Sequence, residues 1–590
     1  MHHNLNLWAS LLLLILCFPF ISASQGFLTG GQVTGNVHVD AQIYSEDEKL
    51  GITDSTLNFK KFGMNGFANV LYSNNNFNAG MRFEGFLNPM TGYDARYEGI
   101  GVPYWFAGYK LGILEMTAGH FYEQFGSGLI LRSWEEWTLG YDNNIYGFHA
   151  KITPVKGISI KGLTGVQRYF WEPYKTDNRG IVRGTDGEIF LNDVFESLSA
   201  SKTKLTFGGS FVSRYEKAEN KTFARDSAWM EVTPAGDTIN WITQTTYQYR
   251  LPVNVGSWAA RMNLARGGFN FYAEYAQKGS DPNATNNFIY KNGQAIYSTL
   301  SYSTKGFGFI LGAKWIDNMS YKSSRNETGS PPMLDINYLP AMSKEHPYSL
   351  STFYPYATKA NGEAGFQGQI IYTIPKNTKL GGKYGTNITA NYSLVNSIKK
   401  EQLSPEIPLD SIGTDGYKAT FLSIGDIPYY RDLNFLLERR IGKKIRVKAA
   451  YYNQTYNLHV IEDDIFDDEK MVYARIGVID FSYKFNSKHA IRAELQGLWT
   501  KEDEGNWVGG GLEYTVSPHW FFSVTDEWNY GHPQEDKQLH YYGFAMGYNE
   551  TTNRIAISYA RQREGLICIG GVCRYVPSFT GFTLSITSSF

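Results

Sequence analysis

The sequence predicts an all-β protein, a single large, closed, antiparallel transmembrane β-barrel, and three observations lead to this fold class. Aromatic residues make up 16% of the chain, with 42 Tyr and 37 Phe, while charged residues make up only 19%. Hydrophobic and polar residues alternate with a period of two over most of the chain. The connections between the alternating segments are alternately short and long. Tyr and Phe suit half-buried strands and the aromatic belts of membrane barrels, whereas soluble enzymes of this length usually carry more Leu, Ala and Glu in helices.

The N-terminus has the features of a secretory signal peptide. Residues 7–21 (LWASLLLLILCFPFI) form an apolar run with the length of an h-region. The small residues at 22–24 allow cleavage before Gln25. The segment before the run contains no Lys or Arg, which weakens the pattern. We expect residues 1–24 to be removed as a signal peptide and residues 25–590 to form the barrel domain.

Two other interpretations of the apolar run fit less well. As a membrane anchor, the run is short for a spanning helix, and Pro19 interrupts it. As a lipoprotein signal, it has Leu16 immediately before Cys17, where a small residue would be expected.

The period-two alternation is clearest in residues 33–43, and residues 77–87 and 491–499 repeat it. One face of the first segment carries Val33, Val37, Val39, Ala41 and Ile43, and the other carries Thr34, Asn36, His38, Asp40 and Gln42. Successive side chains of a strand point to opposite faces, so one face suits lipid and the other suits a polar lumen. We count about 24 such segments, within a range of roughly 22 to 26, and transmembrane strands need about 9–11 residues.

The connections provide an independent test. Residues 517–518 and 549–552 form short connections, whereas residues 564–576 form a long one. Outer-membrane barrels have short periplasmic turns and longer outer loops, so we expect a periplasmic C-terminus. The long outer loops are then expected at about 215–255, 318–363 and 398–429. A β-propeller is the main alternative, but the chain shows no blade repeat.

The last predicted strand, residues 577–590, ends in Phe590. Its apolar face consists of Phe582, Leu584, Ile586 and Phe590. This pattern resembles the C-terminal signal that the outer-membrane barrel assembly machinery reads. The expected location is therefore the outer membrane of a Gram-negative bacterium, with outer-membrane lipid and, during biogenesis, that assembly machinery as partners.

Three segments resemble one family. Residues 120–137 (HFYEQFGSGLILRSWEEW), 336–363 (INYLPAMSKEHPYSLSTFYPYATKANGE) and 563–590 (REGLICIGGVCRYVPSFTGFTLSITSSF) are similar to an uncharacterised Bacteroidetes-type outer-membrane β-barrel family. That family is known as a domain of unknown function that covers most of the mature chain. The resemblance implies the fold and the location, and it implies no catalytic residue.

The polar faces of the predicted strands carry charges of both signs. The candidates for lumen-lining charges are His38, Asp40, Arg82, Glu84, Arg261, Glu274, Glu438, Arg440, Arg446, Lys448, Arg492 and Glu494. Adjacent strands can pair these charges into a network, which either hydrates a pore or fills the lumen. A selective pore more often shows a bias to one sign, so the mixture argues against strong ion selectivity.

The predicted outer loops contain further candidate sites. After cleavage the two remaining cysteines are Cys568 and Cys573, and an oxidising compartment favours a disulfide between them over free thiols. Such a hairpin is either a rigid recognition knob or a staple against proteolysis, and we favour the staple. Residues 461–470 (IEDDIFDDEK) are rich in carboxylates that suit Ca²⁺, although a solvated acidic loop explains them better.

Two other loops are unusually apolar. We expect residues 120–137 either to fold inward as a constriction or to form another strand pair. Residues 318–363 are expected to pack on or into the barrel mouth as a lid, because an exposed aromatic surface of that size would otherwise indicate a partner interface.

No enzyme signature is present in the sequence, so we expect no enzyme, no cofactor and no metal. His38 and Asp40 face the same way and could serve acid–base chemistry, but a polar lumen lining explains them better. The net charge of −1 gives no reason to expect nucleic-acid binding. The favoured hypothesis is a passive channel or transport pore for hydrophilic solutes. The alternatives are a non-conducting scaffold or subunit of an outer-membrane secretion or assembly complex, with outer-membrane protein partners, and, less favoured, a barrel enzyme.

One class of transporter fits the N-terminus poorly. The first predicted strand begins shortly after the cleavage site, so no plug domain is expected before the barrel. This counts against a TonB-dependent transporter.

Overall fold

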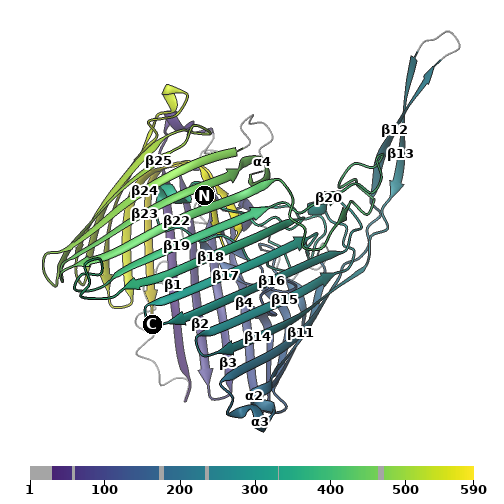
Figure 1. Ribbon diagram of the computed structural model, residues 1–590, viewed down its shortest axis with the longest axis horizontal. Helices are drawn as coiled ribbons and strands as arrows, with labels where there is room; N and C mark the ends of the chain where they lie inside the picture. Colours follow the sequence, from purple (N-terminus) through teal and green to yellow (C-terminus); the bar gives the residue numbers. More distant parts are fainter. Residues whose placement is uncertain are drawn as a thin grey trace, which may run out of the picture.

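The computed structural model consists of one closed antiparallel sheet of 24 strands (Figure 1). The structure describes residues 30–55, 60–171, 179–232, 238–329, 331, 333–462 and 471–590, with the side chains of 225–244 also left undescribed. The predicted signal peptide, residues 1–24, lies outside this part of the chain. Closure is made by β1 (Gln32–Tyr44) and β32 (Phe579–Ser589), which run antiparallel with Asn36 opposite Ser589. The predicted fold class and strand number are confirmed.

Each of the other barrel strands pairs with its two neighbours along the chain. They are β2 (Phe62–Asn74), β3 (Phe77–Leu87), β4 (Gly99–Leu111), β5 (Leu114–Phe121), β8 (Ile145–Ile152), β9 (Ile158–Gln167), β10 (Ile181–Phe190), β11 (Thr203–Tyr215), β14 (Asn254–Arg266), β15 (Phe269–Lys278), β16 (Gly293–Thr304), β17 (Phe307–Asp317), β18 (Glu363–Ile374), β19 (Thr386–Asn396), β22 (Pro428–Ile441), β23 (Ile445–Asn457), β24 (Met471–Lys484), β25 (His489–Trp499), β26 (Trp507–Val516), β27 (Trp520–Trp528), β28 (His540–Glu550) and β29 (Asn553–Gln562).

The two ends of the barrel differ. At the end that carries Phe590, most strands are joined by short turns, and we call it the short-turn end. The opposite end, the long-loop end, carries residues 216–253, 318–362 and 397–427. Within the first of these, β12 (Thr222–Val232) and β13 (Thr238–Gln248) form a hairpin that projects away from the barrel (Figure 1).

The remaining elements are short. The small strands are β6 (Glu135–Glu136), β7 (Tyr141–Asp142), β20 (Lys400–Glu401), β21 (Lys418–Ala419), β30 (Gly565–Ile569) and β31 (Val572–Val576). The helices are α2 (Leu191–Val194), α3 (Glu196–Ser199) and α4 (Leu458–Ile461). Single 3-10 turns are η2 (Glu48–Leu50), η3 (Ala95–Tyr97), η4 (Trp137–Leu139), η5 (Ala284–Asn286), η6 (Ser349–Thr352) and η7 (Glu535–Lys537). Across the described residues, no helix is both long enough and apolar enough to cross a membrane.

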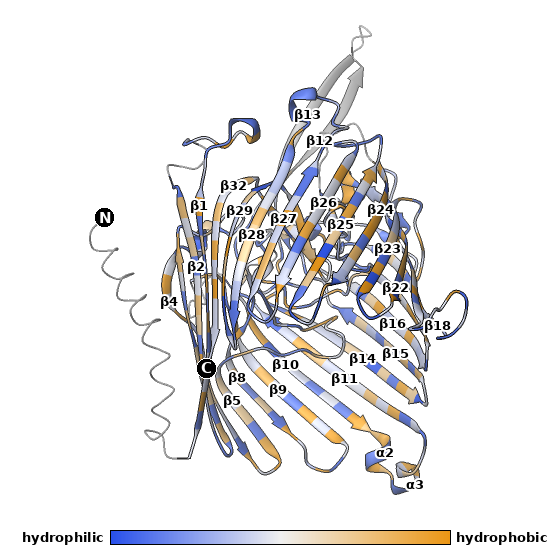
Figure 2. Cartoon of the chain, turned by 90° about the vertical axis from the view of Figure 1, so that its left-hand side faces the viewer, coloured by the Kyte–Doolittle hydropathy of each residue, from blue (hydrophilic) through white to orange (hydrophobic). Residues whose placement is uncertain are grey.

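Hydrophobic and hydrophilic residues alternate along the barrel strands (Figure 2), as the sequence predicts. On β11 and β14, Phe211 and Trp258 are opposite each other and exposed on the outer face, while their neighbours Val212 and Ala259 are buried on the inner face. The same pattern exposes Ile479, Leu495 and Leu512 on later strands. Large apolar side chains on the outer face are what contact with lipid requires.

We predict that Gly35 is essential to the closing seam. The Gly35 N–H donates to the Phe590 carbonyl at 3.0 Å, and the Phe590 N–H donates back at 2.9 Å. A Cβ at position 35 would lie 2.5 Å from the Asn69 carbonyl oxygen and 2.5 Å from the Phe590 ring. Gly35→Ala should therefore lower the free energy of unfolding by about 1–3 kcal/mol, the usual cost of overpacking, measured as a lower denaturant midpoint in detergent.

The matched control for this prediction is Gly187→Ala on β10, where an added Cβ has no neighbour within 4 Å. This control should leave the midpoint unchanged or raise it slightly. Equal midpoints for the two variants would show that the seam tolerates a side chain at position 35.

Candidate functional site

Two long-loop segments lie inside the barrel rather than outside it. We call residues 122–144, between β5 and β8, inner loop A, and residues 318–362, between β17 and β18, inner loop B. Leu129 and Ile130 of inner loop A and Ile336 of inner loop B have no exposed surface. A 24-stranded wall encloses a lumen that its own side chains do not fill, and these loops fill much of it at the long-loop end.

One hydrophobic core forms where both inner loops meet the wall. Phe125 and Leu129 of inner loop A pack with Tyr321 and Ile336 of inner loop B. The wall contributes Ile145, Leu163, Val182, Val212, Val255 and Ile316. Backbone hydrogen bonds join the two loops, because the Arg132 N–H donates to the Ile336 carbonyl at 2.9 Å. The two inner loops therefore fold as one unit against this side of the barrel.

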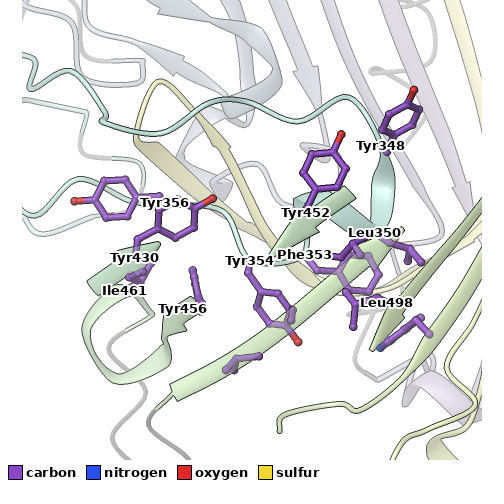
Figure 3. Close-up of a cluster of buried hydrophobic side chains, with 14 of the residues drawn as sticks. Tyr348, Leu350, Phe353, Tyr354, Tyr356, Tyr430, Tyr452, Tyr456, Ile461 and Leu498 are labelled. Carbon is purple, nitrogen blue, oxygen red and sulfur yellow. The ribbon is translucent and has the colours of Figure 1, made fainter. Parts of the chain in front are cut away.

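A second core forms farther along inner loop B (Figure 3). The loop contributes Tyr348, Leu350, Phe353, Tyr354 and Tyr356, and the wall contributes Tyr430, Tyr452, Tyr456, Leu498 and Trp507. The Leu350 N–H also donates to the Gln496 side chain on β25 at 3.1 Å. Inner loop B therefore spans the lumen and is packed against the wall at both ends.

An ion network ties inner loop A to the wall. Arg82 on β3 donates to Glu84 at 2.7 Å and also contacts Glu135 and Asp142 of the loop. Arg168, which follows β9, bridges Glu84 and Asp142, each at 2.7 Å. Burial alone would raise the pKa of the Asp142 carboxyl, but the guanidinium groups of Arg82 and Arg168 outweigh it and lower the pKa to about 2.

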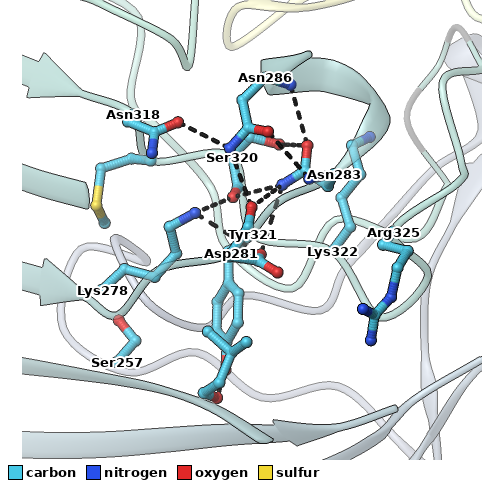
Figure 4. A network of polar contacts seen from close by, with 12 residues as sticks. Ser257, Lys278, Asp281, Asn283, Asn286, Asn318, Ser320, Tyr321, Lys322 and Arg325 are labelled. Carbon is cyan, nitrogen blue, oxygen red and sulfur yellow. Dashed lines mark hydrogen bonds and ion pairs between the residues drawn. The ribbon is translucent and has the colours of Figure 1, made fainter. Parts of the chain in front are cut away.

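A polar network anchors the start of inner loop B (Figure 4). Lys278 on β15 donates to the Ser320 carbonyl of the loop at 2.5 Å. The Asn286 side chain donates to Asn318 at 3.0 Å. Asp281 accepts from Arg214 of β11 at 2.7 Å. These donors compensate loop carbonyls and carboxylates that would otherwise be buried without partners.

The predicted lumen charges nearest the short-turn end remain in contact with water. His38 and Asp40 are 2.7 Å apart, and the His38 side chain is 43% exposed. Arg446 pairs with Glu438 at 2.8 Å. The other predicted members of this group are Arg440, which is exposed, and Lys448, Arg492 and Glu494, which lie in ion pairs around Asp480. We call this polar half of the lumen the vestibule.

Arg261 and Glu274 are opposite each other in register but do not pair. Arg261 instead pairs with Asp186 and Glu188, at 2.8 Å and 2.9 Å. Glu274 accepts from both the backbone N–H and the hydroxyl of Ser127 in inner loop A. Asp186 and Ser127 were not predicted from the sequence. Asp186 lies on a strand, where the alternation of side chains could have predicted that it faces the lumen. Ser127 lies in a loop, where no such pattern exists.

The hairpin β30–β31 packs onto inner loop B. The structure joins Cys568 and Cys573 by a disulfide. At the hairpin tip, the Gly570 carbonyl accepts from the Tyr338 hydroxyl at 2.8 Å, and the Gly571 carbonyl accepts from the Thr358 N–H at 3.0 Å. Both tip glycines have positive φ values, which suit glycine. The Gly570 N–H also donates to the Glu345 carboxylate at 3.0 Å, so the hairpin tip contacts inner loop B through three hydrogen bonds.

The described residues contain no group of three His, Cys, Asp or Glu side chains placed to hold a metal ion. Residues 463–470, most of the predicted acidic loop, lie outside the described part of the chain. The Ca²⁺ alternative therefore stays a prediction.

A family model matches residues 6–590, nearly the whole chain. The chain belongs to a family of unknown function (DUF6029). The resemblance to an uncharacterised family is thereby confirmed, while the Bacteroidetes origin stays a prediction. No curated protein matches the chain.

The solved structures similar to this chain include several membrane proteins. The translocation pore of the P pilus usher PapC has a TM-score of 0.39 and 9% identity, covering 94% of this chain and 99% of that one. The siderophore receptor PirA from Pseudomonas aeruginosa has a TM-score of 0.40 and 10% identity, covering 95% and 80%. The copper transporter OprC has a TM-score of 0.38 and 11% identity, covering 95% and 81%. The fold assignment rests on the closed sheet of this chain and not on these distant likenesses.

We predict that Asp142→Asn loosens inner loop A. The change leaves Arg82 and Arg168 without one of their carboxylates. The lowered pKa, from 3.8 to about 2, means that the charged Asp142 carboxylate stabilises the folded loop by about 2 kcal/mol. Amides of residues 125–132 should then exchange with solvent about 30-fold faster at pH 7, measured by hydrogen exchange with mass spectrometry.

The pH dependence of the native loop has a definite sign. Because the folded pKa of Asp142 lies below 3.8, its contribution is complete above about pH 4 and is lost as the pH falls toward 2. The control Glu438→Gln, in the vestibule, should leave the exchange rates of residues 125–132 unchanged. Unaltered exchange in Asp142→Asn would exclude the ion network as the anchor of inner loop A.

A second prediction concerns the hairpin. Replacing both Cys568 and Cys573 by Ser should cost the hairpin about 2 kcal/mol of chain entropy. Residues 338–358, which the hairpin tip contacts, should exchange faster, while residues 125–132 should not. Hydrogen exchange measures both regions in one experiment. If residues 338–358 exchange as slowly in the variant as in the native protein, the disulfide-linked hairpin does not hold inner loop B.

Proposed function

We propose that this protein is an outer-membrane transport barrel for small hydrophilic solutes, held closed at rest by its own inner loops. The observation that carries the proposal is the division of the lumen into two zones. The half at the long-loop end is filled by two hydrophobic cores. The half at the short-turn end is a polar vestibule whose side chains, such as His38 and Arg446, remain about two-fifths exposed.

The vestibule supports transport of polar solutes. A barrel whose only role is structural has no need of a water-filled half lined by charged side chains. Most of these charges stand beside an opposite charge, as Arg446 does beside Glu438. A wall of compensated charges favours hydrophilic solutes without strong selection of ion sign.

The inner loops support a closed resting state. They are held by side-chain packing and hydrogen bonds, and the two cores pack them against the wall at the long-loop end. Opening therefore requires inner loop B to move, which is a gating motion of the kind that sets the rate in many proteins with lids.

The orientation is part of the same proposal. Short turns suit the periplasmic side and long loops the outer side, so Phe590 would lie in the periplasm and the hairpin β30–β31 outside. The terminal strand, with Phe582, Leu584 and Ile586 on the outer face next to Phe590, would be read by the barrel assembly machinery during biogenesis.

A non-conducting scaffold is the second candidate. Two features favour it: the tight packing of the inner loops, and the β12–β13 hairpin, which projects beyond the barrel where a protein partner could bind (Figure 1).

Conductance in planar bilayers distinguishes the two functions. The native protein should show brief openings, and Leu350→Asp should lengthen them, because a carboxylate in the second core cannot be buried without a partner. Deleting residues 222–248, the projecting hairpin, is the control and should leave the openings unchanged. Native protein that never conducts, and that co-purifies with a protein partner, would support the scaffold and contradict the channel.

A further inference from the structure

A cavity of about 650 Å³ remains between inner loop B, the hairpin and the wall. Tyr338, Phe353 and Tyr354 of inner loop B line it, opposite Tyr541 on β28. Its size lies within the range of small-molecule sites, which are mostly apolar with a few polar groups. The aromatic rings present flat apolar surfaces that suit a ring-shaped ligand.

Two cations that form no ion pair with the described residues line the cavity. Arg563 lies with its guanidinium 3.5 Å from the Phe353 ring centre and donates to the Glu564 carbonyl. Lys344 lines the cavity from inner loop B, and burial lowers the pKa of its ammonium. Within the described residues neither cation forms an ion pair, and the nearest carboxylates are Glu504 and Glu527 for Arg563 and Asp432 for Lys344.

The two cations differ from the deeply buried cations of the lumen in their exposure. Several fully buried cations stand against carboxylates: Arg168 against Glu84, Lys314 against Glu363, and Arg325 against Glu216. Arg563 and Lys344 are half-buried and face the cavity, so they offer charged donors to an anion from outside the chain.

We propose that the cavity binds a small organic anion, with a carboxylate or phosphate group held by Arg563 and Lys344 and a ring packed against the tyrosines. Arginine suits either group, because its planar donors match both. The inference rests on the proposed function in one respect, since it names the class of solute that a transport barrel would select. Three carboxylates also line the cavity and oppose a second negative charge on the ligand: Glu345, Glu564 and, on β27, Glu527.

Binding to the purified barrel in detergent tests the inference by titration calorimetry. The probes are phenyl phosphate and 4-hydroxyphenylacetate, with the neutral alcohol 4-hydroxyphenylethanol and inorganic phosphate as comparisons. Both ring-bearing anions should bind at least about tenfold tighter than the neutral alcohol, as charge-assisted hydrogen bonds predict. A preference for only one of them identifies the group as carboxylate or phosphate. Inorganic phosphate should bind more weakly than phenyl phosphate, because it has no ring.

Three variants assign the effect to residues. Arg563→Gln should remove the preference for the anions, and Glu527→Gln should increase it. Arg440→Gln, an exposed vestibule arginine outside the cavity, should change nothing. Equal affinity for the anions and the neutral alcohol, or an unaltered preference in Arg563→Gln, would overturn the inference.

The titration is independent of conduction. A barrel that conducts but does not bind these anions contradicts the inference alone, and one that binds them but never conducts contradicts the proposed function alone.

Discussion

A closed wall of 24 strands surrounds more space than its own inward side chains can fill, and this constraint governs the rest of the structure. Water can occupy the space only where the wall is polar. At the short-turn end the wall carries paired charges, and the vestibule stays open to water. At the long-loop end the wall carries residues such as Val212, Ile316 and Trp507, which water would not cover favourably. Inner loops A and B cover them instead.

Filling a lumen with loops brings its own cost, because loop backbone is polar. Each buried carbonyl or N–H needs a partner, and the wall supplies many of them. Lys278 donates to a carbonyl of inner loop B, and Gln496 accepts from the Leu350 N–H. The ion network around Asp142 follows the same logic, since a buried carboxylate is tolerated only when cations compensate it. The inner loops are thus held by matched polar contacts as well as by apolar packing.

The strands could be predicted from the sequence because their signal is local. Alternation within 33–43 places His38 and Asp40 on one face and Val39 on the other, without knowledge of any distant residue. The positions of the long loops could be predicted because short and long connections alternate along the chain. The disulfide could also be predicted from local information, because Cys568 and Cys573 are the two cysteines left after the predicted cleavage and lie close together in the chain.

The partners of the inward charges could not be predicted in this way. Glu274 meets Ser127 rather than the opposite Arg261, because inner loop A enters the lumen from a distant part of the chain. Arg168 lies in a loop with no alternation, yet it completes the ion network with Glu84. Residues 318–362 showed only an excess of aromatic side chains, which distinguishes an inward loop from an outer one but does not give its path.

The central claim is that inner loops A and B occupy the lumen at rest. A structure of the barrel in lipid nanodiscs by electron cryomicroscopy tests it most directly. The account predicts density for residues 122–144 and 318–362 inside the barrel, with Leu350 against β25 and the hairpin tip at Gly570 beside Tyr338. A lumen empty along its whole length, with these segments outside the wall, would contradict it.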